Sequence, residues 1–161
     1  METDLKASMK SSMDDSIPPG ETSLQGESRL IFLIGDDVAF AGHLATQITH
    51  FGYTVQTFTH AENACEHIRQ KTPAAIIEDI AFGADEKTGI EPILAPRRDG
   101  DILPPLIFIS SRKDFLTRLK TIRAGGRAYF CKPVDIGGLI DKLDSLTSTE
   151  QPEPFRVLIV E

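Results

Sequence analysis

Side chains that bear oxygen or nitrogen follow four separate apolar runs of the sequence. Asp36 and Asp37 come directly after the first run, Asp79 ends the second, Ser110 ends the third and Lys132 follows the fourth. Three carboxylates brought together repel one another, and a divalent cation offsets that repulsion. Oxygen-only ligands suit Mg²⁺, which takes few carboxylates and keeps several waters.

This set of side chains fits phosphoryl transfer to a carboxylate. With Asp36 and Asp37 binding the metal, Asp79 is expected to approach the ion and present an oxygen as the nucleophile. The metal and Lys132 would offset charge on the phosphoryl oxygens, and Ser110 would donate a hydrogen bond to one of them. Each residue alone has a plainer interpretation, because Asp at a strand end is often a turn residue or a helix N-cap. The joint pattern is harder to produce by chance, since each residue must end a different strand at the same edge.

The elements that would position these residues can be read from the apolar pattern. Five runs predict β-strands at 30–34, 53–58, 74–77, 106–109 and 128–130. Runs that are apolar on both faces are typical of a parallel sheet covered on both sides. Apolar residues at helical spacing predict helices at 38–51, 61–71, 114–124 and 135–146. The third of these helices is expected to have Phe115, Leu119 and Ile122 on one apolar face.

The alternation of strands and helices predicts an α/β fold with a doubly wound, five-stranded parallel sheet. In such sheets the functional crevice lies at the carboxyl ends of the strands, where the polar residues above are placed. A further helix at 89–98 is expected to be short or irregular, because Pro92 and Pro96 lie inside it.

Composition excludes several classes of function. The chain has 161 residues and a formal net charge of −7, which argues against nucleic-acid binding through a basic surface and against docking on an anionic membrane. No apolar run is long enough to span a bilayer, and the first residues contain no secretory signal. Two cysteines are too few for a disulfide framework. The expectation is a cytoplasmic protein.

Domain organisation follows from composition along the chain. Residues 1–28 are rich in polar residues and proline and are expected to form a disordered leader. Residues 29–147 are expected to form one folded domain, and residues 148–161 begin as a polar linker.

Four segments of the folded part resemble the receiver domain of two-component response regulators. They are Leu33–Asp37, Pro73–Ile80, Pro105–Ser111 and Ala124–Pro133. The resemblance covers residues 29 to about 147. It implies the flavodoxin-like fold of receivers, with Asp79 as the phospho-acceptor and Asp36 and Asp37 as the acidic pair.

The resemblance also implies a mechanism. Asp79 would take a phosphoryl group from a histidine kinase or a phosphotransfer protein with Mg²⁺, which Asp36, Asp37, Asp79 and the backbone carbonyl of Ala81 would bind. The protein would then be no enzyme beyond Mg²⁺-dependent self-phosphorylation from a phosphodonor and autodephosphorylation. A phosphorylation-dependent homodimer and a downstream output domain or partner are further expectations.

Switching is the second implication of the resemblance. Ser110 would move toward the phosphoryl group and the switch aromatic Tyr129 would turn inward. The face made by the receiver's fourth helix, fifth strand and fifth helix would then change its preference for partners. Ala81 and Arg112 occupy the positions that tune the lifetime of the phosphoryl group in the family, and the Lys132–Pro133 bond is expected to be cis.

Three departures from the family pattern leave alternatives open. The usual Met-Pro-Gly run after the acceptor is absent, and Glu78 stands where an apolar residue is usual. The third helix of the receiver pattern carries Pro92, Pro96 and the basic pair Arg97-Arg98. Because side chains alternate along a strand, Glu78 is expected to point away from the site toward a helix layer, where it needs a partner. The altered loop and the prolines of the third helix favour one alternative, a pseudo-receiver, which is an interaction module that works without phosphorylation. The intact set of site residues disfavours it. A nucleotide or flavin enzyme is a weaker alternative, because Gly35-Asp36-Asp37 does not form a phosphate-binding loop.

The last residues, Phe155–Glu161, resemble the first strand of a second receiver. That resemblance favours a chain that is the amino-terminal piece of a longer regulator. An extra edge strand or a disordered tail is the alternative interpretation.

Overall fold

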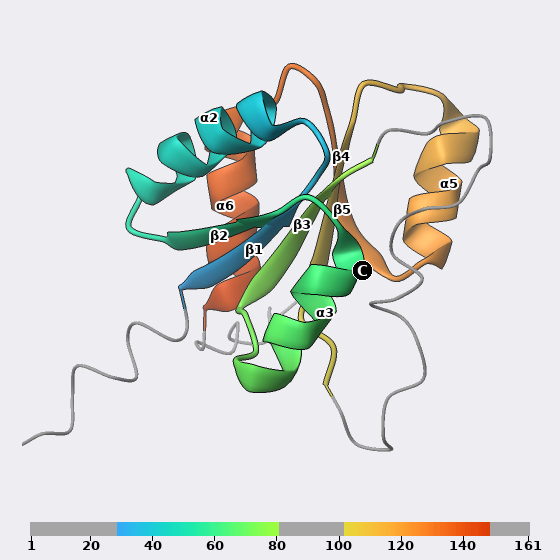
Figure 1. The fold of residues 1–161 in the computed structure, drawn as a ribbon. Helices are drawn as coiled ribbons and strands as arrows, with labels where there is room; N and C mark the ends of the chain where they lie inside the picture. Colours follow the sequence, from blue (N-terminus) through green and yellow to red (C-terminus); the bar gives the residue numbers. More distant parts are fainter. Residues whose placement is uncertain (1–28, 81–101, 149–161) are drawn as a thin grey trace, which may run out of the picture.

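A five-stranded parallel sheet forms the centre of the molecule (Figure 1). The computed structural model describes residues 29–80 and 102–148. The strands are β1 (Leu30–Ile34), β2 (Thr54–Phe58), β3 (Ala75–Asp79), β4 (Leu106–Ser110) and β5 (Gly126–Cys131). Their order across the sheet is β2-β1-β3-β4-β5, and every neighbouring pair is parallel. The predicted α/β fold with a doubly wound parallel sheet is confirmed.

Burial explains the apolar runs. Every residue of β1, β3 and β4 is buried, whereas in the edge strand β2 only Phe58 is buried. Central strands are covered on both faces, so both sets of alternating side chains must be apolar. The exceptions at the end of β3 and β4, Glu78, Asp79 and Ser110, are buried polar residues that therefore need an explanation.

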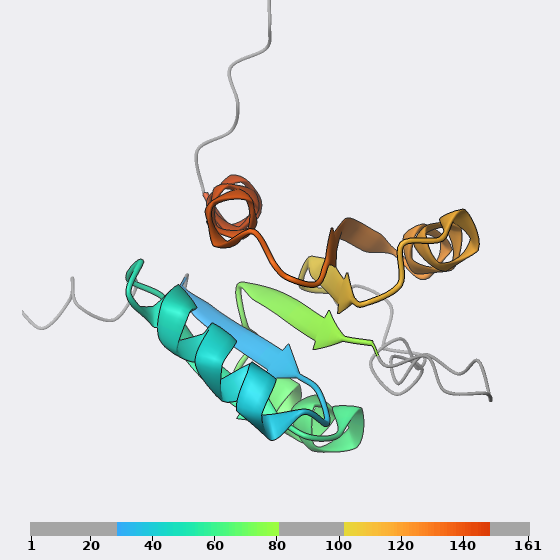
Figure 2. The ribbon, with the colours of Figure 1, turned by 90° about the horizontal axis from the view of Figure 1, so that it is seen from above.

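Helices cover both faces of the sheet. They are α2 (Val38–Thr49), α3 (Ala61–Gln70), α5 (Phe115–Arg123) and α6 (Ile136–Thr147). Figure 2 shows α2 and α6 on one side of the strands and α3 and α5 on the other. Leu44 of α2 and Leu143 of α6 belong to one apolar cluster with Ile77 and Ile109, while Ile68 of α3 packs on the opposite face with Phe108.

Aspartates begin three of the four described helices. The side chains of Asp37, Asp114 and Asp135 accept hydrogen bonds from backbone N–H groups in the first turns of α2, α5 and α6. Such N-caps satisfy donors that have no partner inside the helix. The first helix is shorter than predicted, because it ends at Thr49, and Phe51 beyond it is 51% exposed.

The apolar face of α5 that carries Phe115, Leu119 and Ile122 is not the face that the helix buries. Phe115 is 73% exposed and Ile122 is 64% exposed, whereas the buried residues of this helix are Thr117 and Thr121. The two threonine hydroxyls donate to Asp114 Oδ2 and to the Arg118 carbonyl, at 2.8 Å in both cases. Because these hydroxyls find partners within their own helix, both threonines can be buried at little cost.

Several expectations lie outside the described residues. These concern the leader at 1–28, the helix at 89–98, Ala81, and the linker and second-receiver start within 149–161. Within the described ranges, no helix combines the length and the apolar character needed to cross a membrane.

Candidate functional site

Backbone hydrogen bonds align the strand ends that carry the predicted site. The Gly35 N–H donates to the Phe58 carbonyl at 2.9 Å, and the Ile80 N–H donates to the Ile109 carbonyl at 2.7 Å. The Lys132 N–H donates to the Ser110 carbonyl at 2.9 Å. The parallel register therefore continues one residue past the strands, and the loops after them leave from the same edge.

An ion pair joins two of the predicted residues. Lys132 Nζ lies 2.7 Å from Asp79 Oδ2, and the side chains of these residues are 27% and 5% exposed. Lys132 follows the edge strand β5 and reaches across β4 to the end of β3, as the order of the strands requires. The predicted cis bond between Lys132 and Pro133 is confirmed.

Burial raises the pKa of Asp79 above its usual value. Lys132 lowers it, and the negative charges of Asp36 and Asp37 raise it again. The raised pKa shows that one lysine does not fully compensate for desolvation and for two like charges. Additional positive charge near Asp79 would therefore stabilise its ionised carboxylate.

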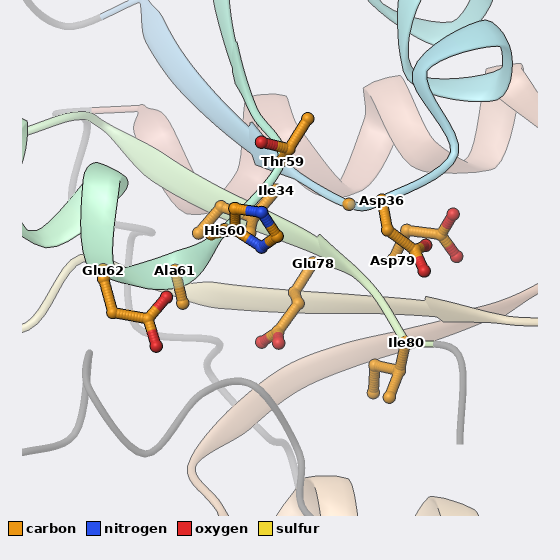
Figure 3. A pocket seen from close by; sticks show the side chains of 10 residues that line it. Ile34, Asp36, Thr59, His60, Ala61, Glu62, Glu78, Asp79 and Ile80 are labelled. Carbon is orange, nitrogen blue, oxygen red and sulfur yellow. The ribbon is translucent and has the colours of Figure 1, made fainter. Parts of the chain in front are cut away.

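The two residues of the acidic pair have different surroundings. Asp36 is exposed and lines the same cavity as Asp79 (Figure 3). Asp37 Oδ1 accepts a hydrogen bond from the Phe40 N–H at 2.9 Å and so caps α2. Among residues 29–80 and 102–148, no group of three His, Cys, Asp or Glu side chains is close enough to bind one ion.

The donor chemistry still fits a hard divalent cation. Mg²⁺ is usually bound through one or two carboxylates and keeps several waters, so Asp36 and Asp79 satisfy its minimum requirement. Gly35 allows Asp79 to lie close to the loop that carries Asp36, because a Cβ added at Gly35 would lie 2.9 Å from Asp79 Cβ. Ala81, the predicted carbonyl ligand, lies outside the described residues.

The predicted switch residues are linked through one loop. Ser110 is fully buried, and its Oγ accepts a hydrogen bond from the Arg112 N–H at 3.2 Å. The Tyr129 hydroxyl donates to the Arg112 carbonyl at 2.6 Å. Burial raises the pKa of Tyr129, so its hydroxyl keeps the proton that it donates. The Arg112 side chain is directed to Asp114, 2.9 Å away.

Glu78 lies on the other side of β3 from Lys132. Its carboxyl is directed into a cavity of about 250 Å³ that His60, Ala61 and Glu62 also line (Figure 3). Only 4% of the residue is exposed, and its Oε2 has no hydrogen-bond partner within the described part of the chain. Burial, followed by the charge of Asp79, raises the pKa of Glu78 to about 7. Glu78 and Asp79 leave β3 in different directions, as predicted, but both line this one cavity (Figure 3).

One contact in the site was not predicted as functional. Lys132 Nζ lies 3.9 Å from the centroid of the Phe40 ring. The sequence signal for Phe40 was its place in the apolar pattern of the first helix, which indicates packing and gives no sign of a charged neighbour.

Comparisons with known proteins agree with this geometry. Residues 31–144 match the family model of the response regulator receiver domain. The transcriptional regulatory protein QseB of Escherichia coli O157:H7 is 26% identical over 117 residues, which are 72% of this chain and 52% of that protein. The chain spans between 26% and 52% of the length of the first curated relatives it matches.

Solved structures give the same fold. The receiver domain of Francisella response regulator 1452 aligns with a TM-score of 0.62 at 21% identity, covering 74% of this chain and 96% of that one. A Burkholderia pseudomallei response regulator with a phosphorylated aspartic acid, a calcium ion and citrate aligns with a TM-score of 0.60 at 20% identity, covering 74% of this chain and 68% of that one. With its sheet order, its paired Asp79 and Lys132 and its family match, the chain belongs to the response regulator receiver domain family.

Proposed function

We propose that this chain is a phospho-accepting receiver in which Asp79 takes a phosphoryl group from a histidine kinase or a phosphotransfer protein. The observation that carries the proposal is the Asp79 carboxylate at the end of β3, 5% exposed and 2.7 Å from Lys132 Nζ. A carboxylate with an adjacent cation is a suitable acceptor, because the ammonium offsets charge on the phosphoryl oxygens.

The transfer moves the phosphoryl group from a phosphohistidine nitrogen of the donor to an oxygen of Asp79. The phosphorus–nitrogen bond breaks, the phosphorus–oxygen bond forms and the donor imidazole leaves. Lys132 holds Oδ2, so we assign the attack to Oδ1. Asp36, Asp37, Asp79 and the Ala81 carbonyl would hold Mg²⁺, which supplies positive charge opposite the phosphoryl oxygens. A phosphorylated aspartic acid and a calcium ion in a structural relative support both the acceptor and the divalent metal.

Signal output would depend on the loop between β4 and α5. We propose that Ser110 moves toward the phosphoryl group and that Tyr129 then leaves the Arg112 carbonyl and turns inward. The face affected is made by α5, β5 and α6, which are the fourth helix, fifth strand and fifth helix of the receiver. Phe115 and Leu116 on α5 are 73% and 65% exposed, which suits a surface that binds a downstream partner or a second copy. Arg112, together with Ala81, is assigned to tuning the lifetime of the phosphoryl group.

The test is intact-protein mass spectrometry after incubation with a small-molecule phosphodonor. Wild type should gain one phosphoryl group, about 80 Da, only when Mg²⁺ is present. Asp79→Asn should gain none. Glu78→Gln is the matched control, because it removes the adjacent carboxyl on the other side of the strand and should leave the gain intact.

Two results would contradict the proposal. A folded wild type that gains no mass with Mg²⁺ would instead favour an interaction module that works without phosphorylation. A gain that persists in Asp79→Asn would place the acceptor elsewhere. In a separate measurement, size-exclusion chromatography of phosphorylated and unphosphorylated wild type tests whether phosphorylation produces a homodimer.

A further inference from the structure

We infer that Phe40 is a positioning residue for Lys132, and that its ring holds the lysine ammonium in place for phosphoryl transfer. The inference deepens the proposed function and rests on it. Lys132 Nζ lies 3.9 Å from the Phe40 ring centroid and 2.7 Å from Asp79 Oδ2. The ammonium is therefore held between a carboxylate and an aromatic ring.

The contact has the geometry of a cation–π interaction. The face of an aromatic ring carries negative charge density, and it attracts a cation within about 6 Å of its centroid. At 3.9 Å the ammonium is well inside that limit. The Lys132 side chain is only 27% exposed, so water screens the attraction less than it would at the surface.

The position of Phe40 is itself fixed by the acidic loop. Phe40 lies in the first turn of α2, and its N–H donates to Asp37 Oδ1 at 2.9 Å. Its half-buried ring packs against the apolar cluster that includes Leu44 and Ile109. One residue thus links the loop after β1 to the lysine after β5, although the two strands are not neighbours in the sheet.

An aromatic ring suits this task better than a second carboxylate. Lysine is a point charge on a flexible stem, so one ion pair restrains it poorly. When Asp79 becomes phosphorylated, the ammonium must pass from a carboxylate oxygen to a phosphoryl oxygen. A ring face accepts such a shift without competing for the charge, because its attraction is broad and leaves the ammonium positive.

The test weakens the negative charge density on the ring face with little change in the ring's shape. In the full chain, Phe40 is replaced by mono-, di- and trifluorophenylalanine, which weaken the negative face step by step. Two further variants are Phe40→Leu, which removes the ring, and Phe40→Tyr, which keeps it. The first readout is the proton chemical shift of the Lys132 ε-methylene group, measured by NMR in the presence of a chelator that removes divalent metal ions. A ring face at this distance should shift that signal upfield in wild type and in Phe40→Tyr, and the shift should be lost in Phe40→Leu.

The second readout is the rate of phosphorylation by a small-molecule phosphodonor at fixed Mg²⁺. The rate should fall with each added fluorine, to about 2- to 5-fold below wild type for trifluorophenylalanine. Phe40→Leu should fall by the same factor, whereas Phe40→Tyr should keep the wild-type rate. Phe51→Leu is the matched control, since Phe51 is 51% exposed beyond the other end of α2 and should change neither readout.

Three results separate the explanations. A wild-type Lys132 signal without the upfield shift would overturn the contact and with it the inference. A rate that is constant across the fluorinated series would also overturn it, because packing alone would then explain the effect of Leu. A wild type that is never phosphorylated would refute the proposed function, whereas the NMR shift, measured without any phosphodonor, would still decide the Phe40–Lys132 contact.

Discussion

The buried carboxyl of Glu78 should make the stability of the domain depend on pH, and replacing it by Gln should remove that dependence. Burial raises the pKa of Glu78 from 4.5 to about 7 in the folded state. Between these values the folded protein holds a proton on Glu78 that the unfolded chain has already released. Stability therefore falls as pH rises through this window, and it is flat above the folded pKa and below the unfolded one.

The size of the effect follows from the shift. The difference between 4.5 and about 7, at roughly 1.36 kcal/mol per pKa unit, corresponds to about 3 kcal/mol in all. Of this, about 2.5 kcal/mol falls between pH 5 and pH 8, because part of the unfolded population still holds the proton at pH 5. That is a large fraction of the stability of an ordinary domain.

The assay is urea denaturation of wild type and Glu78→Gln at pH 5 and at pH 8, in a chelator. The free energy of unfolding of wild type should fall by about 2.5 kcal/mol more than that of Glu78→Gln over this interval. Titrations common to both proteins, including that of Asp79, largely cancel in this comparison. Glu62→Gln, at an exposed carboxyl lining the same cavity, should behave like wild type. Parallel curves for wild type and Glu78→Gln would show that the folded protein holds no extra proton on Glu78.

Two further changes test packing and hydrogen bonding, with urea denaturation as the measurement for both. Gly126→Ala should destabilise the protein by about 1–3 kcal/mol, because a Cβ there would lie 2.7 Å from the Phe108 ring. In the control Gly42→Ala, in α2, the added Cβ meets nothing within 4 Å, and the variant should be more stable by about 0.5–1 kcal/mol. An unchanged stability of Gly126→Ala would contradict the tight approach of the β5 backbone to Phe108. Tyr53→Phe should cost about 1 kcal/mol, because the Tyr53 hydroxyl donates to Asp144 Oδ1 at 2.5 Å, and a cost of zero would mean that this hydrogen bond adds nothing over water.

The sequence predicted the central strands β1, β3 and β4 because central parallel strands are apolar on both faces. Leu30–Ile34 and Leu106–Ser110 are buried at every position, and a continuous apolar run has few other interpretations in a chain of this composition. The opposite directions of Glu78 and Asp79 were also predictable, because alternation along a strand is a local property.

The face that α5 buries could not be predicted in the same way. Its sequence offers Phe115 and Ile122 at helical spacing, and an apolar face normally packs inward. The structure buries Thr117 and Thr121 instead, since their hydroxyls are satisfied by Asp114 and by a backbone carbonyl. Periodicity records where apolar residues recur and carries no information on which surface of the sheet a helix meets.

For the candidate site, local sequence patterns are enough to identify which side chains stand at the ends of the strands. Asp36, Asp79, Ser110 and Lys132 were assigned from local patterns, because a strand end is defined by the residues next to it. Their chemistry, an acidic group with one ammonium, follows from residue type alone.

How these residues meet depends on the three-dimensional packing of the domain. The order β2-β1-β3-β4-β5 brings Lys132 within 2.7 Å of Asp79, a residue 53 positions away, and places the Phe40 ring against the same ammonium. The same packing leaves Glu78 buried with a raised pKa. These distances and pKa values depend on contacts between segments far apart in the chain, and the free energy of such contacts is set by the packing of the whole domain and not by local sequence.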